Sequence, residues 1–155
     1  LTQVTLRLLR FSDLPVEFYL MERVFGLINM AVFIFVNFRL LFRNQEVNLY
    51  RVIGAVNVYL LLALLGAFAF ELIQLTTGNS ISGQAMIDSE QKLTGSDKDF
   101  SIYVYFSLVS LTTVGFGDYT PVNISAKMVS VLMSTVGILY PAVVIAKLVG
   151  YSTHK

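Results

Sequence analysis

The chain has 155 residues, of which 55% are hydrophobic and 14% are charged, and its formal net charge is +1. Soluble domains carry about 25% charged residues, so this low share indicates a membrane protein. The near-neutral net charge gives no basis for binding nucleic acid. The chain has no cysteine and one histidine, His154. It therefore lacks the parts of disulfides, zinc sites and the usual hydrolytic triads, and we expect neither enzyme activity nor an organic cofactor.

The first candidate element lies in residues 1–50, which we expect to form an N-terminal helical segment. Val24 to Phe38 carries no charge, but this run is shorter than the roughly 20 residues that cross a bilayer. It spans only if Arg39 snorkels to the surface and the helix continues to residue 42. The alternative is a helix lying in the membrane interface. Residues 24–42 therefore stay open between these two structures.

Two later runs predict spanning helices. Val52 to Phe70 and Met128 to Ala146 carry no charge, and each has about the length that crosses a hydrocarbon core of roughly 30 Å. We place these helices over residues 51–75 and 121–150.

The segment between the two helices changes character halfway. Residues 76–98 are polar and rich in turn formers, which predicts a loop in water. Residues 99–112 are apolar and aromatic but too short to cross, and such segments are often re-entrant. Asp97 and Asp99 suit the start of a helix there, because acidic groups complement the N-terminal end of the macrodipole. The alternative is an amphipathic helix at the interface.

The orientation follows from the basic residues. The positive-inside rule places both ends of this helix pair in the cytoplasm and the loop 76–98 outside. The basic residues that flank the pair are Arg39, Arg43, Arg51, Lys147 and Lys155. Arg7 and Arg10 form a single R-x-x-R pair, which looks more like an interfacial segment than a voltage sensor.

The segment TVGFGD, residues 113–118, interrupts the apolar pattern with two glycines. Non-helical backbone at membrane depth is tolerated only where protein buries it or where it lines a water-filled path. Glycine adopts left-handed φ without steric cost, so alternating glycines could let successive carbonyls point one way while the side chains point back into protein. A row of carbonyl oxygens, with the Thr113 hydroxyl below them, suits a dehydrated monovalent cation. One chain supplies only one wall, so a closed ring needs several copies.

This segment resembles the selectivity filter of tetrameric potassium channels, whose signature is TVGYG. In that family aromatic residues precede the filter threonine by seven and eight positions, where this chain has Phe106 and Tyr105. The run DYTPV after the filter glycine matches the family's exit from the filter. Gly137 lies at the spacing of the family's inner-helix hinge glycine.

The resemblance implies an all-α integral membrane protein over residues 51–155, in the order outer helix, turret, pore helix, filter and inner helix. It further implies a homotetramer surrounded by membrane lipids, located in the cell membrane with a cytoplasmic C-terminus, that conducts K⁺ ions. The implied filter residues are Thr113, Val114, Gly115, Phe116 and Gly117. The implied filter-supporting residues are Tyr105, Phe106, Thr112, Asp118 and Glu71. The implied pore-lining or gating residues are Gly137, Ile138, Pro141, Ile145 and Val149.

The chain departs from the family at two positions beside the filter. Phe116 replaces the signature tyrosine, and Tyr105 replaces the usual pore-helix tryptophan. We expect the Tyr105 hydroxyl to donate to Asp118 and to replace the lost polar contact. We also expect Pro141 to kink the inner helix, and Gly137→Ala to alter channel opening without altering ion preference.

Several alternatives stay open. A potassium transporter subunit contains related pore loops, and a membrane adaptor could retain a loop that no longer conducts. Glu71 ends the outer helix, where interfacial solvation and a bond to backbone near the filter are both reasonable. Asn123-Ile124-Ser125 matches the glycosylation pattern, although so short a match is close to chance.

Overall fold

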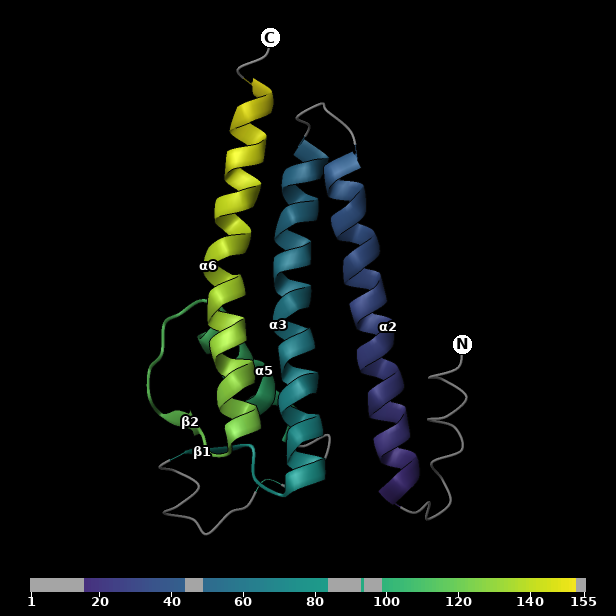
Figure 1. Cartoon of the computed structure of the whole chain (residues 1–155), viewed down its shortest axis with the longest axis vertical. Coiled ribbons are helices and arrows are strands. Elements are labelled where there is room, and N and C mark those ends of the chain that lie inside the picture. Colours follow the sequence, from purple (N-terminus) through teal and green to yellow (C-terminus); the bar gives the residue numbers. More distant parts are fainter. Residues whose placement is uncertain (1–15, 44–48, 84–92, 94–98, 153–155) are drawn as a thin grey trace.

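The computed structural model describes residues 16–43, 49–83, 93 and 99–152. Within them four helices and a two-stranded sheet form in chain order (Figure 1). The elements are α2 (Val16–Arg43), α3 (Leu49–Thr77), β1 (Ile81–Gly83), α5 (Phe100–Leu111), β2 (Tyr119–Pro121) and α6 (Ile124–Ser152). Arg7, Arg10, Asp97 and His154 lie outside the described residues.

Three long helices lie side by side, with α3 between α2 and α6 (Figure 1). By length and composition each of them can cross a membrane, over Leu20–Leu40, Tyr50–Thr77 and Ile124–Lys147. The open question about residues 24–42 therefore has a structural answer. They belong to a helix of membrane-spanning length that packs along α3, and this arrangement favours a spanning helix over an interfacial one.

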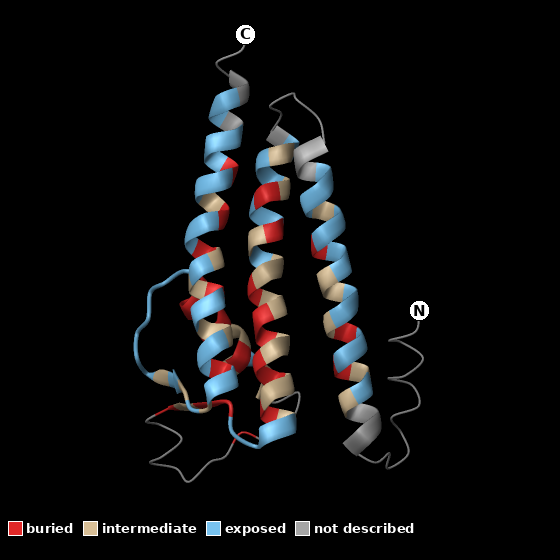
Figure 2. Cartoon of the chain, viewed as in Figure 1, coloured by how far each residue is buried: buried red, intermediate tan, exposed pale blue. Residues whose placement is uncertain are grey.

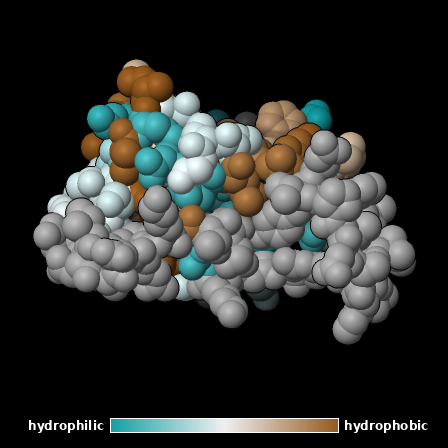
Figure 3. All heavy atoms as spheres, turned by 90° about the horizontal axis from the view of Figure 1, so that it is seen from below, coloured by the Kyte–Doolittle hydropathy of each residue, from teal (hydrophilic) through white to brown (hydrophobic). Residues whose placement is uncertain are grey.

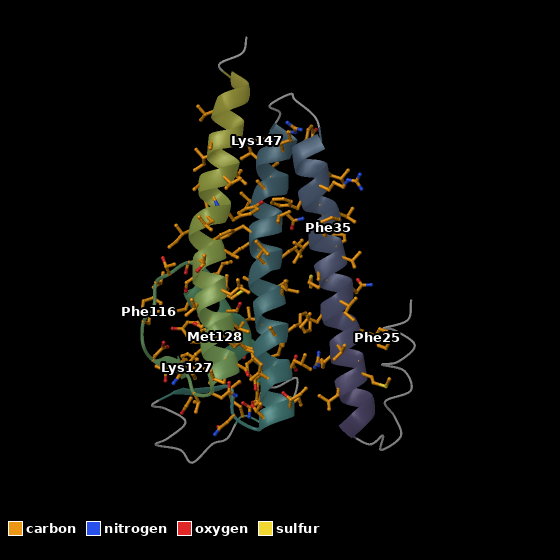
Figure 4. All side chains as sticks on the ribbon, viewed as in Figure 1. Phe25, Phe35, Phe116, Lys127, Met128 and Lys147 are labelled. Atoms are coloured by element: carbon orange, nitrogen blue, oxygen red, sulfur yellow. The ribbon has the colours of Figure 1, made fainter. Side chains whose placement is uncertain are left out.

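Buried residues concentrate on α3 and on the faces turned toward it (Figure 2). The outer faces of α2 and α6 are apolar and exposed, and Phe25 and Phe35 on α2 are examples (Figure 4). Exposed apolar side chains along a helix of this length suit contact with lipid, since the hydrocarbon core is as apolar as they are.

The short helix α5 packs against one end of both α3 and α6. Gly66 on α3 leaves room for Ser107 on α5, whose hydroxyl donates to the Ala63 carbonyl at 2.6 Å. On the same side, the ring of Phe70 meets Phe106 edge-on, with centroids 4.9 Å apart. Small residues that let helices approach closely, and hydroxyls that bond between helices, are typical of membrane interiors.

The predicted loop over residues 76–98 is wrong in part. Ile81–Gly83 forms strand β1, which pairs antiparallel with β2, opposing Ile81 to Pro121 and Gly83 to Tyr119. Ser80, Ile81 and Leu93 are buried, so this stretch does not lie wholly in water. The strand forms because the backbone after the filter segment is extended and offers N–H and C=O groups that need partners.

An ion pair joins α2 to α3 inside the helix layer. The Nη2 of Arg23 lies 3.1 Å from Oε1 of Glu71, and the two side chains are 9% and 0% exposed. Solvation of Glu71 at the membrane interface is therefore wrong, because its side chain is fully buried. Its expected role in supporting the filter stays a prediction. The partner of Glu71 is Arg23, which lies 48 positions earlier in the chain (71 − 23), and the sequence alone did not predict this pairing.

Breaking this pair should destabilise the helix layer. Glu71→Gln leaves the Arg23 guanidinium buried without its counter-charge, and removing one partner of a buried pair costs about 3–5 kcal/mol. We expect the melting temperature of the purified protein to fall markedly.

The matched control is the double substitution Arg23→Met with Glu71→Leu, because replacing both charges by apolar groups is often nearly neutral. Single and double variants that melt at the same temperature as the parent would show that the pair contributes nothing.

Candidate functional site

The TVGFGD segment forms the loop between α5 and β2, and it bulges away from the long helices (Figure 1). Its backbone alternates in sign of φ. Thr113, Gly115 and Gly117 have φ of 58°, 57° and 79°, whereas Val114 and Phe116 between them do not have positive φ. Alternation in the sign of φ can align successive N–H groups on one side of the backbone, and the carbonyls then face the opposite side. Glycine adopts this conformation easily, but Thr113 adopts it at a steric cost.

The side chains of this segment are uncovered within the chain. Val114 is 53% exposed, and Phe116, which is labelled on the loop in Figure 4, is 70% exposed. A Cβ added at Gly115 or Gly117 would meet nothing within 4 Å. We expected these side chains to point back into protein. The described residues of the same chain do not cover them.

The inner end of the segment continues directly from the last turn of α5. The amide of Thr113 donates to the Ser110 carbonyl at 3.2 Å, and the amide of Val114 donates to the Val109 carbonyl at 3.2 Å. The segment thus begins at the carbonyl end of a helix. That end carries the negative pole of the macrodipole, which stabilises a nearby cation.

Two of the expected supporting residues act through α5. The hydroxyl of Thr112 donates to the Leu108 carbonyl at 2.7 Å, so it closes the last turn of the helix. Phe106 is buried against Phe70 of α3, as described above. Both residues therefore hold the helix from which residues 113–117 continue.

The outer end of the segment is held by Tyr105 and Asp118. The Tyr105 hydroxyl donates to Oδ2 of Asp118 at 2.7 Å, which confirms the contact expected from the sequence. The other carboxylate oxygen accepts from the Tyr119 amide at 3.0 Å. The hydrogen bond to the Asp118 carboxylate raises the pKa of Tyr105, with desolvation as a second cause. Removing the phenolic proton would place two negative charges side by side.

Gly137 lies where α6 crosses the end of α5. A Cβ built there would collide with the carbonyl oxygen of Leu111, two residues before Thr113. Pro141, four residues later, has no N–H, so the Gly137 carbonyl lacks its helical donor, while α6 continues through both residues. The expectation that a methyl group at Gly137 leaves the filter untouched is therefore wrong, because that methyl would press on the helix end that carries the filter.

The other expected pore-lining residues lie further along α6. Ile138, Ile145 and Val149 are exposed and Pro141 is half-buried. Their side chains are not covered by α3 or α5 to any large extent, which leaves this face of α6 accessible to a cavity or to another copy of the chain.

Sequence analysis missed a group of serines between α5 and α6. The Ser134 hydroxyl donates to the Ser110 carbonyl at 2.9 Å, and the hydroxyls of Ser110 and Ser130 lie 3.2 Å apart. The sequence contained a signal for this group, namely serines inside otherwise apolar helices. Hydroxyl groups in such helices form hydrogen bonds between helices. These bonds fix α6 to the last turn before the filter segment.

The glycosylation pattern at Asn123 has a structural explanation. Its Oδ1 accepts from the Ala126 amide at 2.7 Å, which caps the start of α6. Its Nδ2 donates to the Thr77 hydroxyl at 2.8 Å and to the Asn79 carbonyl. The Nδ2 group therefore joins the start of α6 to the end of α3 and to the residues that follow it.

Comparison with known proteins gives one match. A family model described as "Ion channel" matches residues 49–153, which begins with α3 and includes α5, the TVGFGD segment and α6. No curated protein and no solved structure matches the chain. The matched region covers more than half of the chain and contains every element that builds the site, so this chain belongs to the ion channel family.

Proposed function

We propose that the chain is the pore-forming subunit of a potassium-selective channel, in which four copies surround one conduction path. K⁺ ions pass in single file between carbonyl rings of Thr113, Val114, Gly115, Phe116 and Gly117, with the Thr113 hydroxyls forming the innermost site. The protein is not an enzyme: it provides a path and catalyses no bond change. It resides in the cell membrane with a cytoplasmic C-terminus, the orientation that the basic residues favour.

The observation that carries this proposal is the alternation of φ at Thr113, Gly115 and Gly117. Carbonyls that face one side can replace the hydration shell of a K⁺ ion, and they supply no carboxylate that would favour a divalent cation. The position directly after the carbonyl end of α5 adds favourable electrostatics for a cation.

The exposure of Val114 and Phe116 supports the assembly of several copies. One strand of carbonyls cannot enclose an ion, and cyclic symmetry closes the ring. In a ring, the side chains that the single chain leaves uncovered lie next to neighbouring copies. The exposed face of α6 with Ile138 and Ile145 then borders the central cavity or the adjacent subunit.

Ion flux from purified protein in liposomes tests the proposal. We expect K⁺ and Rb⁺ to pass readily and Na⁺ poorly, because selectivity follows the number and geometry of the carbonyls. Ba²⁺ should block, since its radius is close to that of K⁺ while its charge holds it in the site. Native mass spectrometry of the same sample should give a tetramer.

Equal K⁺ and Na⁺ flux would contradict the selectivity, and an obligate monomer would contradict the ring. The rate separates the remaining alternatives. A transporter moves ions far more slowly than an open pore, and an adaptor with a vestigial loop moves none.

The contact between Tyr105 and Asp118 gives a second prediction. Tyr105→Phe removes the hydroxyl and keeps the ring, so we expect K⁺-selective current at first and faster loss of current during sustained opening. The control is Tyr50→Phe, because Tyr50 is highly exposed on α3. Equal decay in both variants and the parent would show that the hydroxyl has no supporting role.

The same contact sets a pH dependence. A raised pKa means that the protonated phenol persists above the ordinary tyrosine value of 10.0. Its contribution is fully present below that value and is lost only as the pH rises through the higher pKa of the folded protein. Parent current decay should therefore not change between neutral pH and about 10, and it should accelerate above that range. A parent whose decay accelerates well below pH 10 would contradict the assignment.

The third prediction concerns Gly137→Ala. Because the added methyl would collide with the Leu111 carbonyl, either α6 or the end of α5 must shift, at a typical overpacking cost of about 1–3 kcal/mol. We expect altered opening together with an altered K⁺/Na⁺ flux ratio. Gly150→Ala on the same helix is the control, because a Cβ there meets nothing within 4 Å. Altered opening with the parent's flux ratio would instead favour a simple hinge.

A further inference from the structure

The turret, residues 76–98, begins at the end of α3. At its start the chain turns around the buried side chain of Gln74, and we call this turn the corner. Its Nε2 donates to the carbonyls of Gly78 and Leu93, each at 2.8 Å. Its Oε1 accepts from the amide and the hydroxyl of Ser80, at 2.7 and 2.9 Å. An amide side chain has two donors and one acceptor oxygen with two lone pairs, so every hydrogen-bonding group of Gln74 is satisfied. A fully satisfied buried network fixes the geometry of the backbone that it contacts.

The corner directs β1 onto the backbone that follows the filter segment. The Ser80 carbonyl accepts from the Val122 amide at 2.9 Å, and β1 pairs with β2 from that point to Gly83. At the far end of the pairing, Gly83 lies against Tyr119. A Cβ at Gly83 would meet ring carbons of Tyr119 at 2.7 Å and the Asp118 carbonyl oxygen at 2.9 Å. Real Cβ atoms essentially never come so close, so this position has room only for glycine.

The residues against which Gly83 packs are the ones that hold the outer end of the filter segment. Asp118 accepts the hydrogen bond of Tyr105, and the rings of Tyr105 and Tyr119 meet edge-on with centroids 5.9 Å apart. The inner end of the segment continues from α5, but its outer end has no helix to continue into until Ile124. Figure 3 shows the molecule from the end at which β1 and β2 lie, and there hydrophilic residues form a patch beside apolar ones.

We propose that the turret positions the outer end of the filter through an exit clamp, defined here as Gln74, Ser80, Gly83 and Tyr119. Gln74 and Ser80 fix where β1 starts, and Gly83 lets β1 approach closely enough to hold Tyr119 and the Asp118 carbonyl. These are positioning residues, because they act on the filter through Asp118 and touch no ion. The functional part of this inference rests on the proposed potassium channel.

The variant that tests the clamp is Gly83→Ala in the full chain. It adds one methyl group at the closest approach between the turret and the filter exit. The matched control is Gly54→Ala on α3, where the same methyl meets nothing within 4 Å. Both variants must still assemble like the parent, which size-exclusion chromatography checks.

Hydrogen exchange tests the position of the filter exit without requiring conduction. In Gly83→Ala we expect the amides of Tyr119, Thr120 and Val122 to exchange about tenfold faster than in the parent, the scale of effect that overpacking by one methyl group produces. Gly54→Ala should exchange like the parent. Unchanged protection in Gly83→Ala would overturn the clamp, whether or not the protein conducts.

Ion flux tests the consequence for the filter. We expect Gly83→Ala to lose K⁺ flux about tenfold faster than the parent during sustained conduction, with a smaller difference at high K⁺ concentration. The difference shrinks because an ion bound only to the intact filter stabilises it by mass action. A variant that merely folded poorly would lose flux equally at all K⁺ concentrations. Faster exchange with unchanged flux decay would overturn the role of the clamp in supporting the filter.

A second substitution identifies the cause of the effect. In a Tyr119→Ala background the ring that the new methyl would meet is absent, so Gly83→Ala should accelerate exchange much less than it does in the parent. Equal acceleration in both backgrounds would show that the methyl does not act through the Tyr119 ring, leaving its contact with the Asp118 carbonyl, and would overturn the assignment of Tyr119. If the parent conducts no K⁺ at all, the proposed function fails, while the exchange measurements still decide whether the exit clamp exists.

Discussion

A non-helical backbone segment within the thickness of a membrane has to be held at both ends, because its own polar groups do not bond to one another and need protein or a water-filled path around them. In this chain the inner end follows from the last turn of α5, and α6 presses on that turn at Gly137. The outer end depends on Tyr105, Asp118 and the strand β1. Helix α6, the short helix α5 and the small sheet thus fix these two ends.

The two ends are fixed by different kinds of interaction. At the inner end, close helix packing and serine hydroxyls join α5 to α6, and such contacts respond to small shifts of a helix. At the outer end, charge-assisted and backbone hydrogen bonds join segments that are short and partly exposed. A movement of α6 therefore acts first on the Thr113 side of the TVGFGD segment, while changes in the solution around β1 and β2 act first on the Asp118 side.

The sequence predicted the local features and missed the distant partners. The uncharged runs predicted α3 and α6, and the glycines of TVGFGD predicted left-handed backbone at Gly115 and Gly117. The substitution of tyrosine for tryptophan beside the filter predicted the contact with Asp118, because both positions belong to a recognisable motif. By contrast, the pairs Arg23 with Glu71 and Gly83 with Tyr119 are separated by long stretches of chain, and neither pair follows a periodic pattern. Thr113 at positive φ was also not predicted, since only the surrounding structure makes a β-branched residue adopt that conformation.

The buried pair of Arg23 and Glu71 has a consequence for how the protein enters the membrane. A lone arginine costs about 2.5–3.5 kcal/mol at the bilayer centre, even on the more permissive scales. Arg23 and Glu71 lie near the ends of their candidate spans, so the cost of each lone charge is smaller but still unfavourable. Each of α2 and α3 carries one member of the pair, and their charges cancel only when the two helices lie side by side. The two helices are therefore best inserted together as a hairpin, and the short link between Arg43 and Leu49 keeps the partners close during synthesis. Helices α5 and α6 would then be added to a pair that has already neutralised these two charges.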